Sequence, residues 1–82
     1  MQAQIATPEK TIFAGPADSI SVIGEKGQLQ ILPRHAGLVT FLYPGPVVIE
    51  SLQGGSRTFN LSVGGVLRVD GDTVMVLAKR VQ

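Results

Sequence analysis

Hydrophobic and polar residues alternate with a period of two through much of the chain. Such alternation is typical of β-strands that bury one face. It occurs in the segments 19–22, 28–31, 59–63 and 67–69. The segments 47–49 and 74–77 are apolar without interruption, which predicts strands covered on both sides or lying in the middle of a sandwich. Two short strand candidates, 2–7 and 10–13, flank Pro8.

Glycine and proline divide the chain between these segments. The 10 Gly and 5 Pro leave little room for helices, which typically need about 8–20 uninterrupted residues. The Gly-containing segments 24–27, 53–56 and 70–72 each separate two strand candidates and fit tight turns, because Gly adopts positive φ at little steric cost. Pro44-Gly45 has the residue order of a type II turn. The pattern predicts an all-β sandwich or barrel of about nine or ten strands.

The length of 82 residues predicts one domain that spans 1–82. Hydrophobic residues make up 44% of the chain and charged residues 16%, so some apolar surface could remain for a partner. The net charge of +1 is scattered, which argues against nucleic-acid binding. The sequence contains no cysteine, no signal-peptide pattern and no long apolar segment. We therefore expect membrane association only through a protein partner.

Residue types suited to catalysis or metal binding are few. His35 is the only histidine, and without cysteine a zinc site would need an unusual carboxylate-rich ligand set. No serine lies in a Gly-x-Ser-x-Gly turn. Gly64-Gly65 precede a strand candidate rather than a helix, so they predict a bend or a close backbone approach and no phosphate loop. We predict no catalytic, cofactor-binding or metal-binding residues, although a small hydrolase built on His35 stays an open alternative.

The aromatic residues test a second alternative function, that of a small β-sandwich module that binds a carbohydrate or peptide. They are Phe13, Phe41, Tyr43 and Phe59. At strand spacing we expect these rings in the core and not along a binding groove, which disfavours this alternative. In the loop 27–37, a bend brings Arg34 and His35 together and could form a contact surface. An ordinary connecting loop is the simpler interpretation.

Four segments have the residues and spacing of a known family. They are Thr-Pro-Glu-Lys-Thr-Ile-Phe-Ala-Gly at 7–15, Ile-Leu-Pro at 31–33 with His35-Ala36 and Leu-Val-Thr at 38–40, Ser-Val-Gly-Gly-Val-Leu at 62–67, and Val-Met-Val-Leu-Ala at 74–78. In this order they resemble the N-terminal β-sandwich domain of the ATP synthase epsilon subunit, which is called delta in mitochondria. The resemblance covers nearly the whole chain.

This resemblance implies a sandwich of two antiparallel sheets with about five strands each. It also implies a rotor subunit of the central stalk, which joins the gamma subunit to the c-ring and couples ion-driven rotation to ATP synthesis in other subunits. Such a subunit has no catalytic site and no cofactor, and we expect it to be monomeric when isolated. Its expected location is the cytoplasmic face of the bacterial inner membrane, as a peripheral part of the synthase.

The resemblance also assigns partner contacts by position. It implies contacts with gamma at Thr7, His35 and Thr40, and contacts with the c-ring at Gln28, Gln30 and Arg34. We expect an apolar patch on one sheet and a polar end that carries both Gln28 and Arg34.

The chain departs from the family pattern at several positions. Family members often have Glu where Gln28 stands, Gly and Pro where Arg34 and Gly37 stand, and an acidic residue where Lys79 stands, so contact details should differ. Epsilon subunits usually continue into a C-terminal helical hairpin that can inhibit ATP hydrolysis. We expect no such helical domain within 1–82, and assign no inhibition to this segment.

Overall fold

The chain folds into strands alone. The computed structural model describes all residues, 1–82. Its nine strands are β1 (Gln2–Ala6), β2 (Thr11–Pro16), β3 (Ser19–Gly24), β4 (Gly27–Ile31), β5 (Leu38–Leu42), β6 (Gly45–Ser51), β7 (Gly55–Leu61), β8 (Gly65–Asp70) and β9 (Thr73–Ala78). No helix is present that could cross a bilayer. The predicted all-β class is confirmed.

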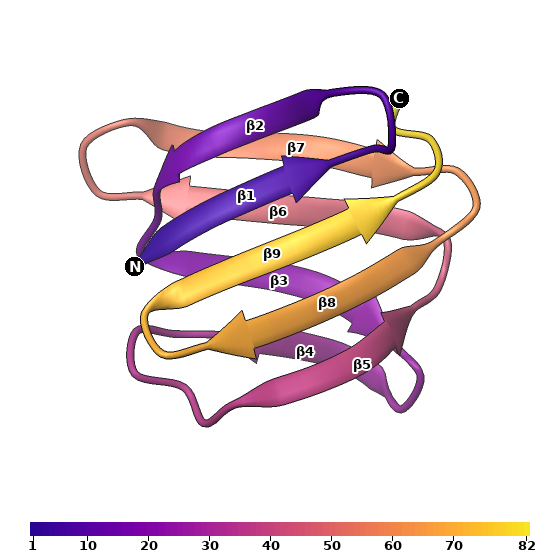
Figure 1. Ribbon diagram of the computed structural model, residues 1–82. Helices are drawn as coiled ribbons and strands as arrows, with labels where there is room; N and C mark the ends of the chain where they lie inside the picture. The colour runs from indigo at the N-terminus through magenta and orange to yellow at the C-terminus, as the bar shows by residue number, and fades with distance from the viewer.

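The strands form two layers with the core between them (Figure 1). The layer nearer the viewer, here called the front sheet, has the strand order β2–β1–β9–β8–β5. The back sheet has the order β4–β3–β6–β7. The two layers are continuous only at one edge, where Gly24 of β3 pairs with Leu42 of β5. The molecule is therefore a sandwich made by one sheet that curls over on itself.

Two details differ from the expected ten antiparallel strands. The structure has nine strands, and β1 pairs parallel with β9, with Ile5 opposite Val76. A parallel pair needs a long connection, and here almost the whole chain lies between β1 and β9. After β9, the main chain reaches β7 through a bridge between Leu61 and Val81. This contact is too short to count as a tenth strand.

The core follows from the alternation in the sequence. On most strands the apolar residues of one parity point between the sheets, as Leu67 and Val69 do on β8 and Val74 and Val76 do on β9. The core contains 16 buried hydrophobic residues. The largest fully buried side chains are Ile5, Ile20, Ile31, Leu61 and Leu67. Burial of this apolar surface is the main stabilising contribution to the fold.

The Gly64-Gly65 pair lies where the backbone leaves no room for side chains. A Cβ atom at Gly64 would collide with the carbonyl oxygen of Leu42, and a Cβ atom at Gly65 would collide with that of Leu77. Gly64 also has a φ of 82°, which favours glycine. The prediction of a close backbone approach is confirmed.

The aromatic residues divide into two pairs. Phe59 is buried and Phe13 is half-buried, with their ring centroids 5.6 Å apart between β2 and β7. In contrast, Phe41 is 64% exposed and Tyr43 is 53% exposed. The expectation that all these rings belong to the core is therefore wrong for Phe41 and Tyr43. On β5 the even-numbered residues Leu38, Thr40 and Leu42 face inward, so Phe41 must face outward.

Candidate partner-binding face

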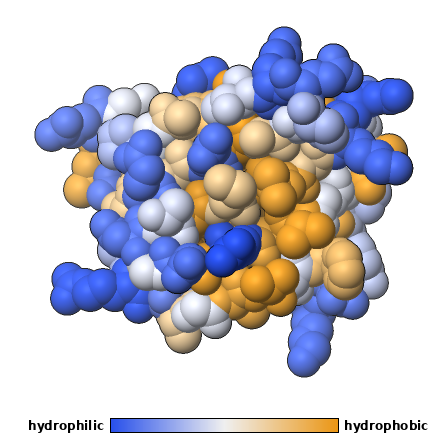
Figure 2. Space-filling view, in the orientation of Figure 1, coloured by the Kyte–Doolittle hydropathy of each residue, from blue (hydrophilic) through white to orange (hydrophobic).

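The outward side of the front sheet carries apolar residues that nothing in the chain covers. In the strand pairing, one row across the sheet runs Phe41, Val66, Leu77 and Ala6. The next row runs Val39, Arg68, Met75 and Gln4. We call the apolar members of the two rows, Ala6, Val39, Phe41, Val66, Met75 and Leu77, the outer apolar face. Figure 2 shows a broad hydrophobic area on this side of the molecule.

The exposure of these side chains is high for large apolar residues. Val39 is 68% exposed, Phe41 64% and Leu77 46%. The uninterrupted apolar segment 74–77 predicted a strand covered on both sides or lying in the middle of a sandwich. In the structure, β9 lies in the middle of the front sheet and only its inner side is covered. Val74 and Val76 lie in the core, while Leu77 points outward. A contiguous exposed apolar area of this kind marks an interaction surface.

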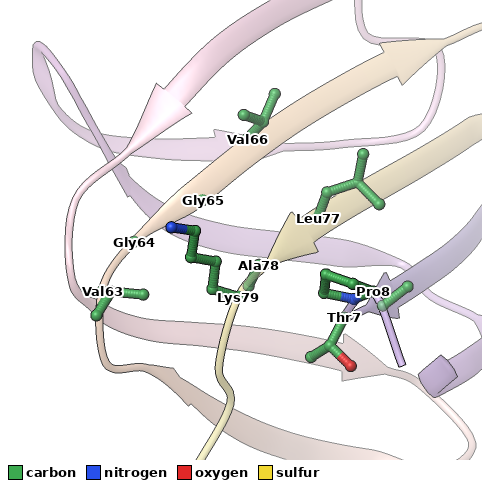
Figure 3. A pocket seen from close by; sticks show the side chains of 10 residues that line it. Thr7, Pro8, Val63, Gly64, Gly65, Val66, Leu77, Ala78 and Lys79 are labelled. Atoms are coloured by element: carbon green, nitrogen blue, oxygen red, sulfur yellow. The ribbon is translucent and has the colours of Figure 1, made fainter. Parts of the chain in front are cut away.

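A shallow groove lies at one end of the outer apolar face, with a volume of about 580 Å³. Figure 3 shows Val66 and Leu77 on its strands, and Thr7 with Pro8 and Lys79 at its border. Its floor includes the bare backbone of Gly64-Gly65, where no side chain fits. The groove extends the apolar surface toward the β1–β2 turn and the β7–β8 loop.

Thr7 is the one predicted gamma contact that lines this groove. Its backbone N–H donates to the carbonyl oxygen of Lys10 at 2.9 Å, and the N–H of Lys10 donates to the Thr7 hydroxyl at 3.3 Å. These bonds close the turn between β1 and β2, with Pro8 and Glu9 at its tip. Thr7 is therefore held in place at the border of the outer apolar face.

His35 and Arg34 lie at the opposite end of the front sheet, in the connection between β4 and β5. They line a hollow together with Met1 and Asp72. The imidazole Nδ1 of His35 lies 2.7 Å from the carbonyl oxygen of Ala36, and Arg34 has a φ of 65°. The bend brings Arg34 and His35 together, as the sequence predicted. No group of three or more metal-ligating side chains occurs here or elsewhere in the chain.

Gln28 and Gln30 are exposed on β4 and point to the same side, because they are two residues apart on a strand. Gln28 pairs with Ile23 next to the β3–β4 turn, whereas Ile31 at the other end of β4 leads toward Arg34. Between Gln28 and Ile31 the strand rises roughly 10 Å, and the chain continues away from Gln28 to Arg34. The expected polar end with both Gln28 and Arg34 is therefore wrong, since these residues lie at opposite ends of the sandwich.

Thr40 faces inward on β5, opposite Leu67, and is half-buried. It lines a hollow of about 340 Å³ between the edges of β4 and β5, and Gln28 lines the same hollow. The structure thus does not gather Thr7, His35 and Thr40 into one cluster. It does bring Thr40 near Gln28, although the resemblance assigned these two residues to different partners.

Several residues of the face were not predicted as site residues. Val39, Phe41 and Leu77 form its most exposed part, and Arg68 lies among them in the second row. One signal for them was present in the sequence: β5 is apolar at both parities, with Leu38 and Leu42 on one side and Val39 and Phe41 on the other. Periodicity alone could not show that the second side stays uncovered.

The fold is that of a small β-sandwich domain with an exposed apolar outer face on one sheet. A family model described as "ATP synthase, Delta/Epsilon chain, beta-sandwich domain" matches residues 1–82. The chain belongs to this family, as its sequence resemblance predicted.

Two ATP synthase epsilon chains illustrate the sequence similarity. The one from Xylella fastidiosa is 41% identical over 78 residues, which cover 95% of this chain and 55% of the relative. The one from Delftia acidovorans is 38% identical over 78 residues, covering 95% of this chain and 56% of the relative. The chain thus spans about half the length of the curated relatives it matches.

Solved structures share the fold. A chain in the central stalk and c-ring of the Tetrahymena thermophila mitochondrial ATP synthase superposes with a TM-score of 0.81 at 20% identity, over 99% of this chain and 64% of that chain. A chain in the Euglena gracilis mitochondrial ATP synthase gives a TM-score of 0.89 at 21% identity, over 98% and 51% respectively. At these identities the likeness establishes the sandwich architecture.

Proposed function

We propose that this chain is a rotor subunit of the central stalk in a rotary ATP synthase. In this role it joins the gamma subunit to the c-ring and transmits ion-driven rotation toward the subunits that make ATP. Family membership supports the complex, and the name of the Tetrahymena thermophila structure refers to the central stalk and c-ring. The observation that carries the proposal is the outer apolar face, a surface suited to permanent contact with another protein.

The outer apolar face is the proposed gamma contact. Phe41 and Leu77 belong to the same row, on the two strands that flank β8, and offer side chains that a partner could bury. Thr7 fits this contact because it borders the groove at the end of the face. We retain His35 and Thr40 as gamma contacts at the margins, where one lies in the β4–β5 connection and the other on the inward side of β5.

The proposed c-ring contact consists of polar groups on and after β4, namely Gln28, Gln30 and Arg34. The amide side chains of the two glutamines are exposed and free to form hydrogen bonds with polar loops. Because Gln28 and Thr40 line one hollow, the two partner surfaces adjoin at the open edge between β4 and β5. A partner loop in this hollow could touch both surfaces.

The proposed role is mechanical, and the catalytic chemistry is assigned to other subunits. His35 has no serine or carboxylate hydrogen-bonded to its ring and instead contacts the carbonyl of Ala36, an arrangement without a nucleophile–base pair. We further propose that the chain lies at the cytoplasmic face of a bacterial inner membrane, held there by its partners.

The first test is co-purification of this chain with the gamma subunit of the same synthase, followed by reconstitution with the c-ring complex. We expect a stoichiometric complex that restores coupling of rotation to ATP synthesis. We also expect gamma to raise the melting temperature of the chain, because binding to the folded state stabilises it.

A folded chain that fails to bind gamma, with no shift in melting temperature at saturating gamma, would contradict this proposal. That result would favour a separate β-sandwich binding module, for which the exposed rings of Phe41 and Tyr43 supply contact groups.

A further inference from the structure

Arg68 is a cation placed within the outer apolar face. It points outward from β8 between Val39 of β5 and Met75 of β9. Along its own strand the outward neighbours are Val66 and Asp70. Figure 2 shows strongly hydrophilic atoms within the hydrophobic area of this side. A partner that covers the apolar neighbours must therefore also cover the guanidinium group.

The hydrogen-bonding capacity of Arg68 is almost unused within the chain. Its guanidinium has five N–H donors, and the structure shows no hydrogen bond from any of them to another residue. Its one ionic contact joins Nη2 to Oδ2 of Asp70 at 3.5 Å. Both side chains are mostly exposed, at 64% and 76%, so water now satisfies the remaining donors.

Covering the face removes that water. A buried charge without hydrogen-bond partners is costly, and a single long contact with Asp70 leaves most of the five donors without acceptors. Asp70 is the last residue of β8 and can turn toward solvent. The other five side-chain carboxylates are elsewhere or already in contact with another cation. Asp72, in the β8–β9 turn, lies 3.9 Å from the N-terminal amino group, and Asp18 accepts from Leu52 N–H. The remaining three are Glu9 in the β1–β2 turn, Glu25 in the β3–β4 turn and Glu50 on β6.

We propose that the surface which docks on the outer apolar face carries a carboxylate opposite Arg68, and that this ion pair selects the partner. The pair would be bidentate, since the planar guanidinium and a carboxylate match in geometry. The apolar rows supply contact area, while Arg68 excludes a surface that is apolar but lacks an acid at this point. This inference rests on the proposed function, with gamma as the partner.

The test measures the affinity of gamma for the intact chain and four variants. Arg68→Met keeps the length and apolar stem of the side chain but removes its charge. Arg68→Lys keeps the charge and loses the planar fork. Arg57→Met is the matched control, because it removes a guanidinium from β7 of the back sheet. Leu77→Asp tests the apolar face independently of Arg68.

We expect Arg68→Met to weaken the binding of gamma about tenfold or more. The affinity of Arg68→Lys should lie between that of Arg68→Met and that of the unchanged chain. Arg57→Met should leave the affinity unchanged. Each variant should keep its melting temperature within a few degrees, since Arg68 is exposed. A fifth variant, Arg68→Glu, should lose binding, and one gamma variant with an Asp or Glu changed to Arg should restore it.

Binding of Arg68→Met as tight as that of the unchanged chain, or tighter, would overturn the ion pair, because a cation buried without an acceptor weakens binding. If Leu77→Asp still abolishes binding in that case, the proposed function survives and only the Arg68 inference fails. Two other results would contradict both the proposed docking face and the ion pair. One is that Leu77→Asp binds gamma with full affinity, and the other is that the unchanged chain does not bind gamma.

Discussion

The two sheets have the same kind of inner surface and opposite kinds of outer surface. On the back sheet, one outward row consists of Gln30, Ser21, Val48 and Thr58. On the front sheet, the corresponding row of Phe41, Val66, Leu77 and Ala6 is entirely apolar. The large exposed hydrophobic residues that lie within strands, Val39, Phe41 and Leu77, all belong to the front sheet.

This difference separates residues that stabilise the fold from residues that we propose bind a partner. The inner faces must be apolar for the sandwich to form, whichever sheet is considered. An outer face has no such requirement, and the back sheet has the polar outer side usual for a solvated sheet. The apolar outer side of the front sheet is therefore the feature that the proposed gamma contact explains.

The largest expected effect is a difference in stability between substitutions on the inner and outer sides of the front sheet. Leu67→Ala should lower the free energy of unfolding by about 3 kcal/mol, because Leu67 is fully buried between the sheets and its removal leaves a cavity. Leu77→Ala, on the outer side, should cost less than about 1 kcal/mol. Urea denaturation of both variants measures the two losses of unfolding free energy. Equal losses would mean that the outer row packs as tightly as the core.

The next largest effect is a difference in gamma affinity between substitutions on the outer sides of the two sheets. Leu77→Asp should weaken gamma binding about 100-fold, because it places a charge in the centre of the proposed contact. Thr58→Asp, on the outer side of the back sheet, should leave the affinity within about twofold of the original. Calorimetric titration with gamma gives both values. A larger loss for Thr58→Asp would assign docking to the back sheet.

A smaller effect concerns the groove at the end of the outer apolar face. Gly64→Ala should destabilise the fold by about 2 kcal/mol, because the added Cβ meets the carbonyl of Leu42 and φ is positive. Gly71→Ala is the control, since its φ is also positive but the space around it is open, and it should cost only about 1 kcal/mol. Thermal unfolding compares them. Equal costs would show that φ alone requires glycine at Gly64.

The smallest effect contrasts two arginines, one on each sheet. The guanidinium of Arg57 lies 5.3 Å from the ring centroid of Phe13 and 5.1 Å from that of Phe59, so its charge already has partners within the chain. Arg57→Met should lower the unfolding free energy by about 0.5–1 kcal/mol, and Arg68→Met should leave it unchanged. Chemical denaturation of Arg57→Met and Arg68→Met measures the change in unfolding free energy for each variant. A lower unfolding free energy for Arg68→Met would instead mean that the contact of Arg68 with Asp70 stabilises the isolated fold.

Much of the fold could be predicted from the sequence because its physical basis is local. Period-two alternation showed which residues of β8 and β9 face the core, and Gly and Pro marked the turns. The Gly64-Gly65 pair was correctly assigned to a close backbone approach. The nine strands agree with the nine or ten that the pattern predicted. The tenth strand that the resemblance implied is absent, because the segment around Val81 makes only a single bridge with β7.

The sequence by itself therefore determined the all-β class, the parity of the buried residues and, through its motifs, the family. Only the tertiary structure decided which apolar side of β5 and β9 stays bare, that Gln28 and Arg34 lie at opposite ends, and that Arg68 stands among apolar neighbours from other strands. The reason is physical. Strand alternation depends on neighbours along the chain, whereas exposure and cross-strand neighbours depend on which strands pair and what covers them, and those contacts join residues far apart in sequence.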